Sequence, residues 1–218
     1  MSNRALAEIV AHLGRVAYCD GFVAGLSSAQ WAALRYFFRA NRFSRTVSAF
    51  ADFHATTRGT ASQTVKSLVS RGYLKRTRSR RDGRSITLDL TDAGLAILAE
   101  DPFEALVGAV GHLPAEARID LATTLDAMMK EVARQRGKRP FGTCDACAYF
   151  AADRAEPAQE CRCRCRLMEE PISAEEMAQV CVNYVPALGF VGDDAAVGAA
   201  ERPAQPRLRD DRPDDRSY

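Results

Sequence analysis

Residues 56–74 read TTRGTASQTVKSLVSRGYL, and this stretch predicts an amphipathic helix followed by a sharp stop. Four of its apolar residues recur at helical spacing and are expected to face inward, namely Ala61, Val65, Leu68 and Val69. Much of the other face is small, polar or basic, with Thr60, Ser62, Gln63 and Lys66. Gly72 stands where a C-terminal helix cap favours glycine. The stretch therefore predicts a helix with one buried face and one face that is free to form hydrogen bonds.

A basic hairpin is predicted directly after this helix, in LKRTRSRRDGRSITLDL at 74–90. The dipeptide Asp82-Gly83 is a strong hairpin-turn signal. Ile86, Leu88 and Leu90 alternate with polar residues, so one face of the second strand is expected to be buried. Residues 71–84 hold seven basic residues and one acid, a net charge of +6, whereas the whole chain carries +2. A solvated arginine-rich loop and a surface that neutralises DNA phosphates both account for such a charge.

Three helices are predicted before the 56–74 stretch. Residues 3–20 have apolar positions at helical spacing, and residues 46–54 fit a short helix. Between them, Ser27 and Gln30 have the S-x-x-Q spacing of a capping box. The helix that this box begins is expected to bury Trp31, Leu34, Phe37 and Phe38. Helices followed by a basic hairpin are the order of a winged helix-turn-helix, whose second helix enters the major groove of DNA while the wing contacts the backbone or minor groove.

Helical patterns return after the hairpin. TDAG at 91–94 begins a helix, and 103–136 is helical with a break at 112–114, where Pro114 suits the first turn of a new helix. The last helix carries an apolar stripe of Leu121, Leu125, Met128 and Val132. This stripe and the one on 3–20 can pack on the central unit, on each other or on a second copy of the chain. We predict the last of these, a homodimer through both helices.

Composition limits the classes of protein that the chain can belong to. A length of 218 residues with 47% hydrophobic content is enough to bury a core. No apolar run approaches the roughly 20 residues of a membrane span, and the N-terminal stretch has no continuous apolar block or cleavage site typical of a signal peptide. The expected location is therefore the cytoplasm, with no membrane association. In a reducing compartment, clustered cysteines bind metal or perform redox chemistry more often than they form disulfides.

The segments LSSAQWAALRYF and TRGTASQTVKSLVSRGYLKRTRSRRDGRSITLDLTDAG, with their flanking helices, resemble the MarR family of bacterial transcriptional regulators over roughly residues 5–136. The resemblance implies a winged-helix dimer with interlocking terminal helices. It also implies a palindromic double-stranded DNA operator, often bound by a repressor that a small-molecule effector or thiol oxidation releases. One departure from the family pattern is RANRFSRTV at 39–47, which makes the connection between the second and third helices longer and more basic.

The same resemblance implies which residues contact DNA. The recognition helix corresponds to 58–70, and the wing arginine corresponds to Arg84, preceded by Asp82. Gln63 and Lys66 are expected at base edges or adjacent phosphates, whereas the wing arginines contact the backbone or minor groove. The full predicted DNA-binding set is Arg58, Thr60, Ser62, Gln63, Lys66, Arg78, Arg80, Arg81 and Arg84.

Six of the seven cysteines follow the regulator-like region, and they are Cys144, Cys147, Cys161, Cys163, Cys165 and Cys181. The C-x-x-C spacing of Cys144 and Cys147 lets two thiolates reach one ion. In ECRCRC at 160–165, the three cysteines fall on one face if the stretch is extended. A single centre needs four ligands. The predicted set is Cys144, Cys147, Cys163 and Cys181, with Cys161 and Cys165 as alternatives.

Three interpretations of these cysteines stay open. A structural zinc site would hold together a lobe that is poor in apolar residues. An iron–sulfur cluster would use the same four thiolates and respond to oxygen, nitric oxide or iron supply. Compositional noise is the third interpretation, and it is disfavoured because Cys144, Cys147 and Cys181 lie outside the repeat. Cys19 stands apart and is interpreted as a small apolar packing residue rather than a redox sensor.

Taken together, the patterns predict a mainly α fold with a small β-hairpin wing. The predicted parts are a winged-helix DNA-binding and dimerisation domain at 1–138, a cysteine-rich metal-binding lobe at 139–190 and a disordered tail at 191–218. The predicted function is that of a sequence-specific transcriptional repressor whose cysteine cluster senses redox state or metal. The alternative is a thiol or iron–sulfur redox protein that uses the winged helix to dock on a protein. No glycine-rich phosphate loop, Ser/His/Asp arrangement or thioredoxin-type strand–helix unit supports an enzyme.

Overall fold

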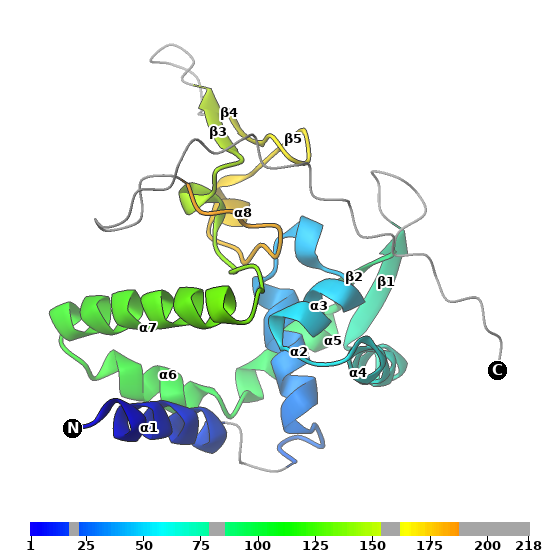
Figure 1. The fold of residues 1–218 in the computed structure, drawn as a ribbon. Coiled ribbons are helices and arrows are strands. Elements are labelled where there is room, and N and C mark those ends of the chain that lie inside the picture. Colours follow the sequence, from blue (N-terminus) through cyan, green and yellow to red (C-terminus); the bar gives the residue numbers. More distant parts are fainter. Residues whose placement is uncertain (18–21, 79–85, 154–161, 188–218) are drawn as a thin grey trace.

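The computed structural model describes residues 1–17, 22–78, 86–153 and 162–187, and Figure 1 shows their arrangement. The turn dipeptide Asp82-Gly83, Cys19, Cys161, three of the wing arginines (Arg80, Arg81 and Arg84) and the predicted tail lie outside the described residues. The described elements form a central winged helix, a set of peripheral helices and a small cysteine lobe. No helix in these ranges is both long and apolar enough to cross a membrane.

The central winged helix contains α2 (Ser28–Arg39), η1 (Arg42–Ser44), α3 (Val47–Phe53), α4 (Arg58–Ser70), β1 (Leu74–Arg78), β2 (Ile86–Leu90), α5 (Asp92–Ile97) and η2 (Leu98–Glu100). β1 and β2 pair antiparallel, with Leu74 opposite Leu90 and Arg78 opposite Ile86. The core is formed by α2, α3, α4 and the base of the hairpin, with Trp31, Phe37, Val65, Leu68 and Leu88 almost fully buried. The predicted helix–helix–hairpin order is therefore confirmed.

Local signals place the ends of these helices where they were expected. Ser27 and Gln30 form the predicted capping box at the start of α2. α4 ends in a Schellman motif: Gly72, at a φ of +76°, donates its N–H to the Val69 carbonyl, and the N–H of Tyr73 reaches the Leu68 carbonyl.

Two predicted core positions are wrong. Phe38 is 55% exposed because it lies in the last turn of α2, while the buried surface extends round the helix to Ala33 and Tyr36. Ile86 is 44% exposed because it pairs with Arg78 at the far end of the hairpin, away from the helices that cover Leu88.

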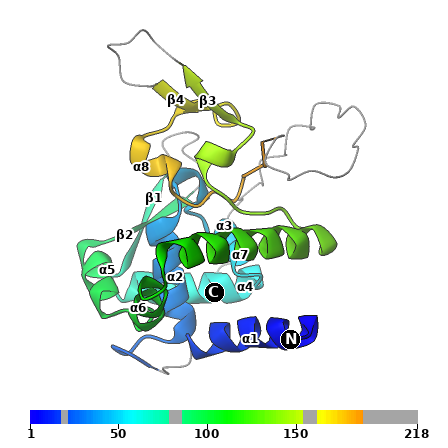
Figure 2. The ribbon, with the colours of Figure 1, turned by 90° about the vertical axis from the view of Figure 1, so that its left-hand side faces the viewer.

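The peripheral helices are α1 (Asn3–Val16), α6 (Glu104–Gly111) and α7 (Ala115–Gln135). Figures 1 and 2 show them to one side of the winged helix. None of the three contains a buried residue. Their large apolar side chains are exposed instead, including Leu6, Ile9, Leu13, Val16, Val107, Ile119, Leu121, Met129 and Val132. The described part of the same chain therefore leaves the two predicted apolar stripes largely uncovered.

The cysteine lobe contains η3 (Cys144–Ala146), β3 (Phe150–Asp153), β4 (Arg162–Cys165), β5 (Glu170–Pro171) and α8 (Ala174–Met177). Its strands form an antiparallel sheet in the order β3-β4-β5. β4 is extended, which is the condition under which alternate cysteines such as Cys163 and Cys165 fall on one face. Figures 1 and 2 both show the lobe at the opposite end of the molecule from α1.

Candidate functional site

The outward face of α4 is polar and accessible. Ser62, Gln63 and Lys66 are exposed, and Arg58 lies exposed in the first turn. Thr60 is exposed too, but its hydroxyl shares a 2.8 Å hydrogen bond with the hydroxyl of Thr57, the N-cap residue of α4. Thr60 therefore belongs to the cap of the helix as well as to its outer face.

The inner side of α4 and the base of the hairpin are held by specific contacts. The side-chain amide of Gln30 donates to the Ser67 hydroxyl at 2.8 Å, which joins α2 to α4. Thr91 donates its hydroxyl to the Gly72 carbonyl at 2.6 Å. A Cβ on Gly94 would lie 2.1 Å from the Tyr73 carbonyl oxygen, so only glycine allows α5 to approach the hairpin this closely. These contacts fix the angle at which the hairpin leaves the helix.

The described part of the wing is strongly basic. Lys75, Arg76 and Arg78 are exposed on β1, and they follow directly after the C-terminus of α4. A polar helix face beside a cationic strand matches the grooves and the phosphate backbone of a duplex, since amides and amines can contact base edges while guanidinium groups neutralise phosphates.

The connection between α2 and α3, residues 39–45, joins the wing to the cysteine lobe. Arg45 forms an ion pair with Asp89 of β2 at 3.0 Å, and its carbonyl accepts the N–H of Leu88 at 2.8 Å. On the other side, Val180 of the lobe donates its N–H to the Arg39 carbonyl at 2.8 Å and accepts the N–H of Asn41 at 3.0 Å. The sequence did not predict that this connection contacts both the hairpin and the lobe, although its length and basic charge were the features that set it apart.

Arg42 is the main ionic contact between the connection and the lobe. Its guanidinium lies 2.5 Å from a carboxylate oxygen of Glu176 and 3.2 Å from one of Glu170. It also donates to the Pro171 carbonyl at 2.5 Å. The main-chain pairing and the ionic contact together hold the lobe against the winged helix.

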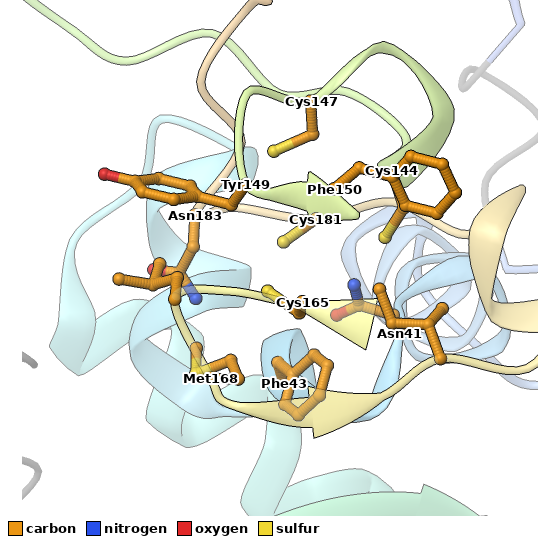
Figure 3. Close-up of a pocket in the computed structure, with 12 residues that line it drawn as sticks. Asn41, Phe43, Cys144, Cys147, Tyr149, Phe150, Cys165, Met168, Cys181 and Asn183 are labelled. Atoms are coloured by element: carbon orange, nitrogen blue, oxygen red, sulfur yellow. The ribbon is translucent and has the colours of Figure 1, made fainter. Parts of the chain in front are cut away.

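A cavity at this junction is lined by four thiols, those of Cys144, Cys147, Cys165 and Cys181, as Figure 3 shows. Its other walls are largely apolar, with Phe43, Tyr149, Phe150, Leu167, Met168 and Ile172, and two asparagines, Asn41 and Asn183, complete the lining. Cys163 does not line the cavity and is buried in the small core of the lobe with Cys144 and Ile172. Over the residues that the structure describes, no three His, Cys, Asp or Glu side chains are arranged to hold a metal ion.

Burial favours the protonated form of two thiols in this cavity, those of Cys144 and Cys181. It raises the pKa of Cys144 to about 12, and the neighbouring thiols of Cys181, Cys147 and Cys165 add to the increase. Burial likewise raises the pKa of Cys181, while the side-chain amide of Asn41 acts in the opposite direction on both groups. A cation in the cavity would favour the thiolate forms, because metal binding releases the thiol protons.

Asn41 also lines this cavity, and the sequence did not single it out. It is 1% exposed, and neither its amide nitrogen nor its amide oxygen makes a hydrogen bond of ordinary geometry within the described structure. Figure 3 shows its amide at the edge of the cavity, beside the thiols. A buried and unsatisfied amide is costly, and such a group calls for an explanation.

The geometry of α4 and the hairpin is that of a winged helix-turn-helix, and comparison with known proteins agrees. Residues 24–85 match the model of the MarR family. The resemblance to this family is thereby confirmed over residues 24–85. The matched segment does not include the cysteine lobe.

Several solved structures are similar to the chain at low identity. A MarR transcriptional regulator from Methanosarcina mazei Go1 is 19% identical, with a TM-score of 0.48 over 61% of this chain and 99% of that one. A MarR/EmrR family transcriptional regulator from Acinetobacter sp. ADP1 is 18% identical, with a TM-score of 0.49 over 61% and 97%. MepR of S. aureus in a complex with DNA is 17% identical, with a TM-score of 0.49 over 60% and 96%. No curated protein matches the chain.

Proposed function

We propose that this protein is a transcriptional regulator that binds double-stranded DNA through α4 and the hairpin wing, and that it acts as a repressor rather than as an enzyme. The observation that carries the proposal is the polar outer face of α4 next to the exposed cations of β1. The match of residues 24–85 to the MarR family supports it.

The two parts of the interface have different roles. Gln63 and Lys66, exposed on α4, contact base edges or adjacent phosphates, with Arg58, Thr60 and Ser62 close to the backbone. Arg78 and the wing arginines Arg80, Arg81 and Arg84 bind the backbone or the minor groove. Affinity then depends mainly on the wing, and sequence preference mainly on the helix.

A homodimer through α1, α6 and α7 presents two such interfaces to a palindromic operator. The support for it is the apolar surface on these helices, which includes Ile9 at 52% exposure, Ile119 at 65% and Met129 at 64%. A soluble monomer rarely leaves a large contiguous apolar surface open to water. Two-fold symmetry of the protein would then be matched by two half-sites in the DNA.

The cysteine lobe supplies the regulatory input in this proposal. The lobe contacts residues 39–45, and Arg45 of this connection forms an ion pair with Asp89 of β2 in the wing. A change in the lobe that displaced this connection would alter the position of the wing. The expected size of such coupling between two sites is about 5- to 150-fold in DNA affinity.

The test begins with selection of duplexes from a random DNA library by the full-length protein, followed by binding measurements on the selected and a scrambled duplex at several salt concentrations. We expect Arg84→Ala to weaken binding to both duplexes and to lower the salt slope by about one. Gln63→Ala should relax the preference at one operator position, at a cost of about 1–3 kcal/mol on the selected duplex alone.

Arg134→Ala is the matched control, because Arg134 is an exposed arginine on α7 that pairs with Glu131 rather than with the wing. It should leave both affinities unchanged. A selection that enriches no sequence, or affinities that do not depend on salt, would exclude the proposed function. Equal effects of Arg84→Ala and Gln63→Ala on both duplexes would exclude the division of roles.

A further inference from the structure

We propose that Cys144, Cys147, Cys165 and Cys181 bind one thiophilic metal centre, zinc or an iron–sulfur cluster, and that the amide of Asn41 completes its surroundings. This assignment deepens the sensory role proposed above and rests on it for its biological meaning, but its test requires no DNA. It replaces Cys163, the ligand that the sequence favours, with Cys165.

Three structural units of the lobe bring the four thiols to one cavity. η3 provides Cys144 and, at its C-terminal end, Cys147, whose N–H returns to the Cys144 carbonyl at 3.1 Å. Cys165 is the last residue of β4, paired with Phe150. Cys181 donates its N–H to the Gly142 carbonyl at 2.8 Å.

The backbone around Cys181 requires a glycine opposite it. A Cβ at Gly142 would lie 2.7 Å from the ring of Tyr184, so a side chain there would displace the ring or the backbone that carries Cys181. The position of the Cys181 thiol is therefore fixed by close packing within the lobe.

The donor set determines the class of metal. Four thiolates favour zinc or an iron–sulfur cluster over the oxygen-seeking cations, and both take four sulfur ligands. The four side chains are not arranged around an ion among the described residues, so metal binding requires the thiols to turn about their Cα–Cβ bonds, which can occupy several staggered positions. Largely apolar walls, such as Phe43, Phe150 and Met168, keep water from the centre.

Asn41 provides an observation from outside the lobe. Its side chain comes from the winged helix and is 1% exposed, and its amide, which makes no hydrogen bond of ordinary geometry within the described structure, faces the thiols of Cys144 and Cys181. A metal-bound thiolate is a strong acceptor that would satisfy the amide N–H, and hydrogen bonds of this kind orient the ligands and tune the metal. Asn41 is thus a positioning residue for the centre, and it joins the centre to the connection that contacts the wing.

The experiment measures metal in the full-length protein, produced with iron and zinc in the medium and purified without oxygen or chelator. We expect either about one zinc per chain in a colourless protein, or iron with equimolar inorganic sulfide in a brown one. Both results support the centre and identify its metal. Absence of stoichiometric zinc or iron would overturn the proposal, whatever the DNA-binding result.

Cys165→Ser and Cys163→Ser form the matched pair, because the two cysteines lie two residues apart on the same strand. Cys165→Ser should lower metal occupancy at least tenfold, whereas Cys163→Ser should keep it. Trp31, the only tryptophan, is buried in the winged helix, so unchanged Trp31 fluorescence shows that a metal-free variant is still folded there. Loss of metal in Cys163→Ser with retention in Cys165→Ser would overturn the assignment, as would equal loss in both.

Asn41→Leu tests the positioning residue, since leucine has a similar size but no donor. We expect about tenfold faster loss of metal to a competing chelator and a shift of the thiolate-to-metal charge-transfer band, in cobalt-substituted protein if the metal is zinc. A purely structural role would not move this band. An unchanged band would remove Asn41 from the proposal.

Discussion

The winged helix and the cysteine lobe lie side by side but have very different interiors. Among the residues that the structure describes, the core cluster of the winged helix contains fifteen buried residues, among them Trp31, Phe37 and Phe50, whereas that of the lobe contains three, of which two are cysteines. Apolar burial at about 25 cal/mol per Å² can stabilise the first, but it gives little to the second. Small domains without a sufficient core depend on disulfides or metals. The proposed metal centre would supply the lobe with stability that its small apolar core does not provide, whereas the winged helix has no such need.

Removal of metal is expected to have the largest effect and to separate the two regions. Metal binding to a structural four-ligand site contributes folding free energy, on the order of 10 kcal/mol in small zinc peptides. In metal-free protein or in Cys147→Ser, the amides of Ala148, Arg166 and Cys181 should lose their protection from hydrogen exchange. Amides in α2 and α4 should keep theirs. Equal protection of the lobe with and without metal would contradict the comparison.

Phe37→Ala is expected to have the next largest effect, on the winged helix. Phe37 is fully buried, with its ring 5.2 Å from that of Tyr36 and 5.7 Å from that of Phe50. Its truncation should lower the free energy of unfolding by about 3–5 kcal/mol, measured by denaturant titration of Trp31 fluorescence. Phe38→Ala is the control because Phe38 is 55% exposed, and its effect should be a small fraction of this. Similar losses for both variants would mean that this core is not the main source of stability.

The contact between the two regions should be weaker than either interior. Arg42 and Glu176 are 38% and 15% exposed and lie 2.5 Å apart, so a double-mutant cycle with Arg42→Ala and Glu176→Ala should give a coupling of about 1 kcal/mol. The observable is the protection of the Val180 and Asn41 amides, and the coupling should decrease in high salt. The more exposed pair of Arg134 and Glu131 is the control, for which no measurable coupling is expected. No coupling between Arg42 and Glu176 would indicate that main-chain pairing alone joins the regions.

The smallest expected effect is a pH dependence confined to the winged helix. Burial, together with the positive charge of Arg35, lowers the pKa of His54, which is in ring contact with Tyr36 and Phe50. The unfolded chain, with a histidine pKa of about 6.5, then takes up a proton at a higher pH than the folded protein does. The free energy of unfolding should therefore fall as the pH decreases through that value.

Thermal melting followed by Trp31 fluorescence between neutral and mildly acidic pH measures this effect. His54→Gln should flatten the dependence, and His112→Gln, at an exposed position, should preserve it. A wild-type slope of the opposite sign, or one that His54→Gln leaves unchanged, would show that His54 is not the group responsible.

Much of the winged helix could be predicted because its determinants are local. The spacing of Ala61, Val65 and Leu68, with a glycine at 72, predicts a helix within residues 56–74, since helical periodicity and capping act within a few residues, and α4 is observed at Arg58–Ser70. The same holds for the capping box of Ser27 and Gln30. The exposed polar face of α4 follows directly from the same periodicity.

Tertiary structure alone decided which distant residues meet. Arg42 and Glu176 are 134 positions apart, and no spacing in the sequence connects them. Periodicity could put Cys163 and Cys165 on one face of a strand, but only the folded lobe, in which β4 pairs with β3 and β5, shows that Cys165 lines the cavity and Cys163 does not. The sequence did not identify Asn41, because its burial and its place at the cavity depend on residues that are distant in the sequence. Helices, caps and turns follow from the spacing of residues along the chain, whereas a site at the junction of two regions forms only when distant segments pack together.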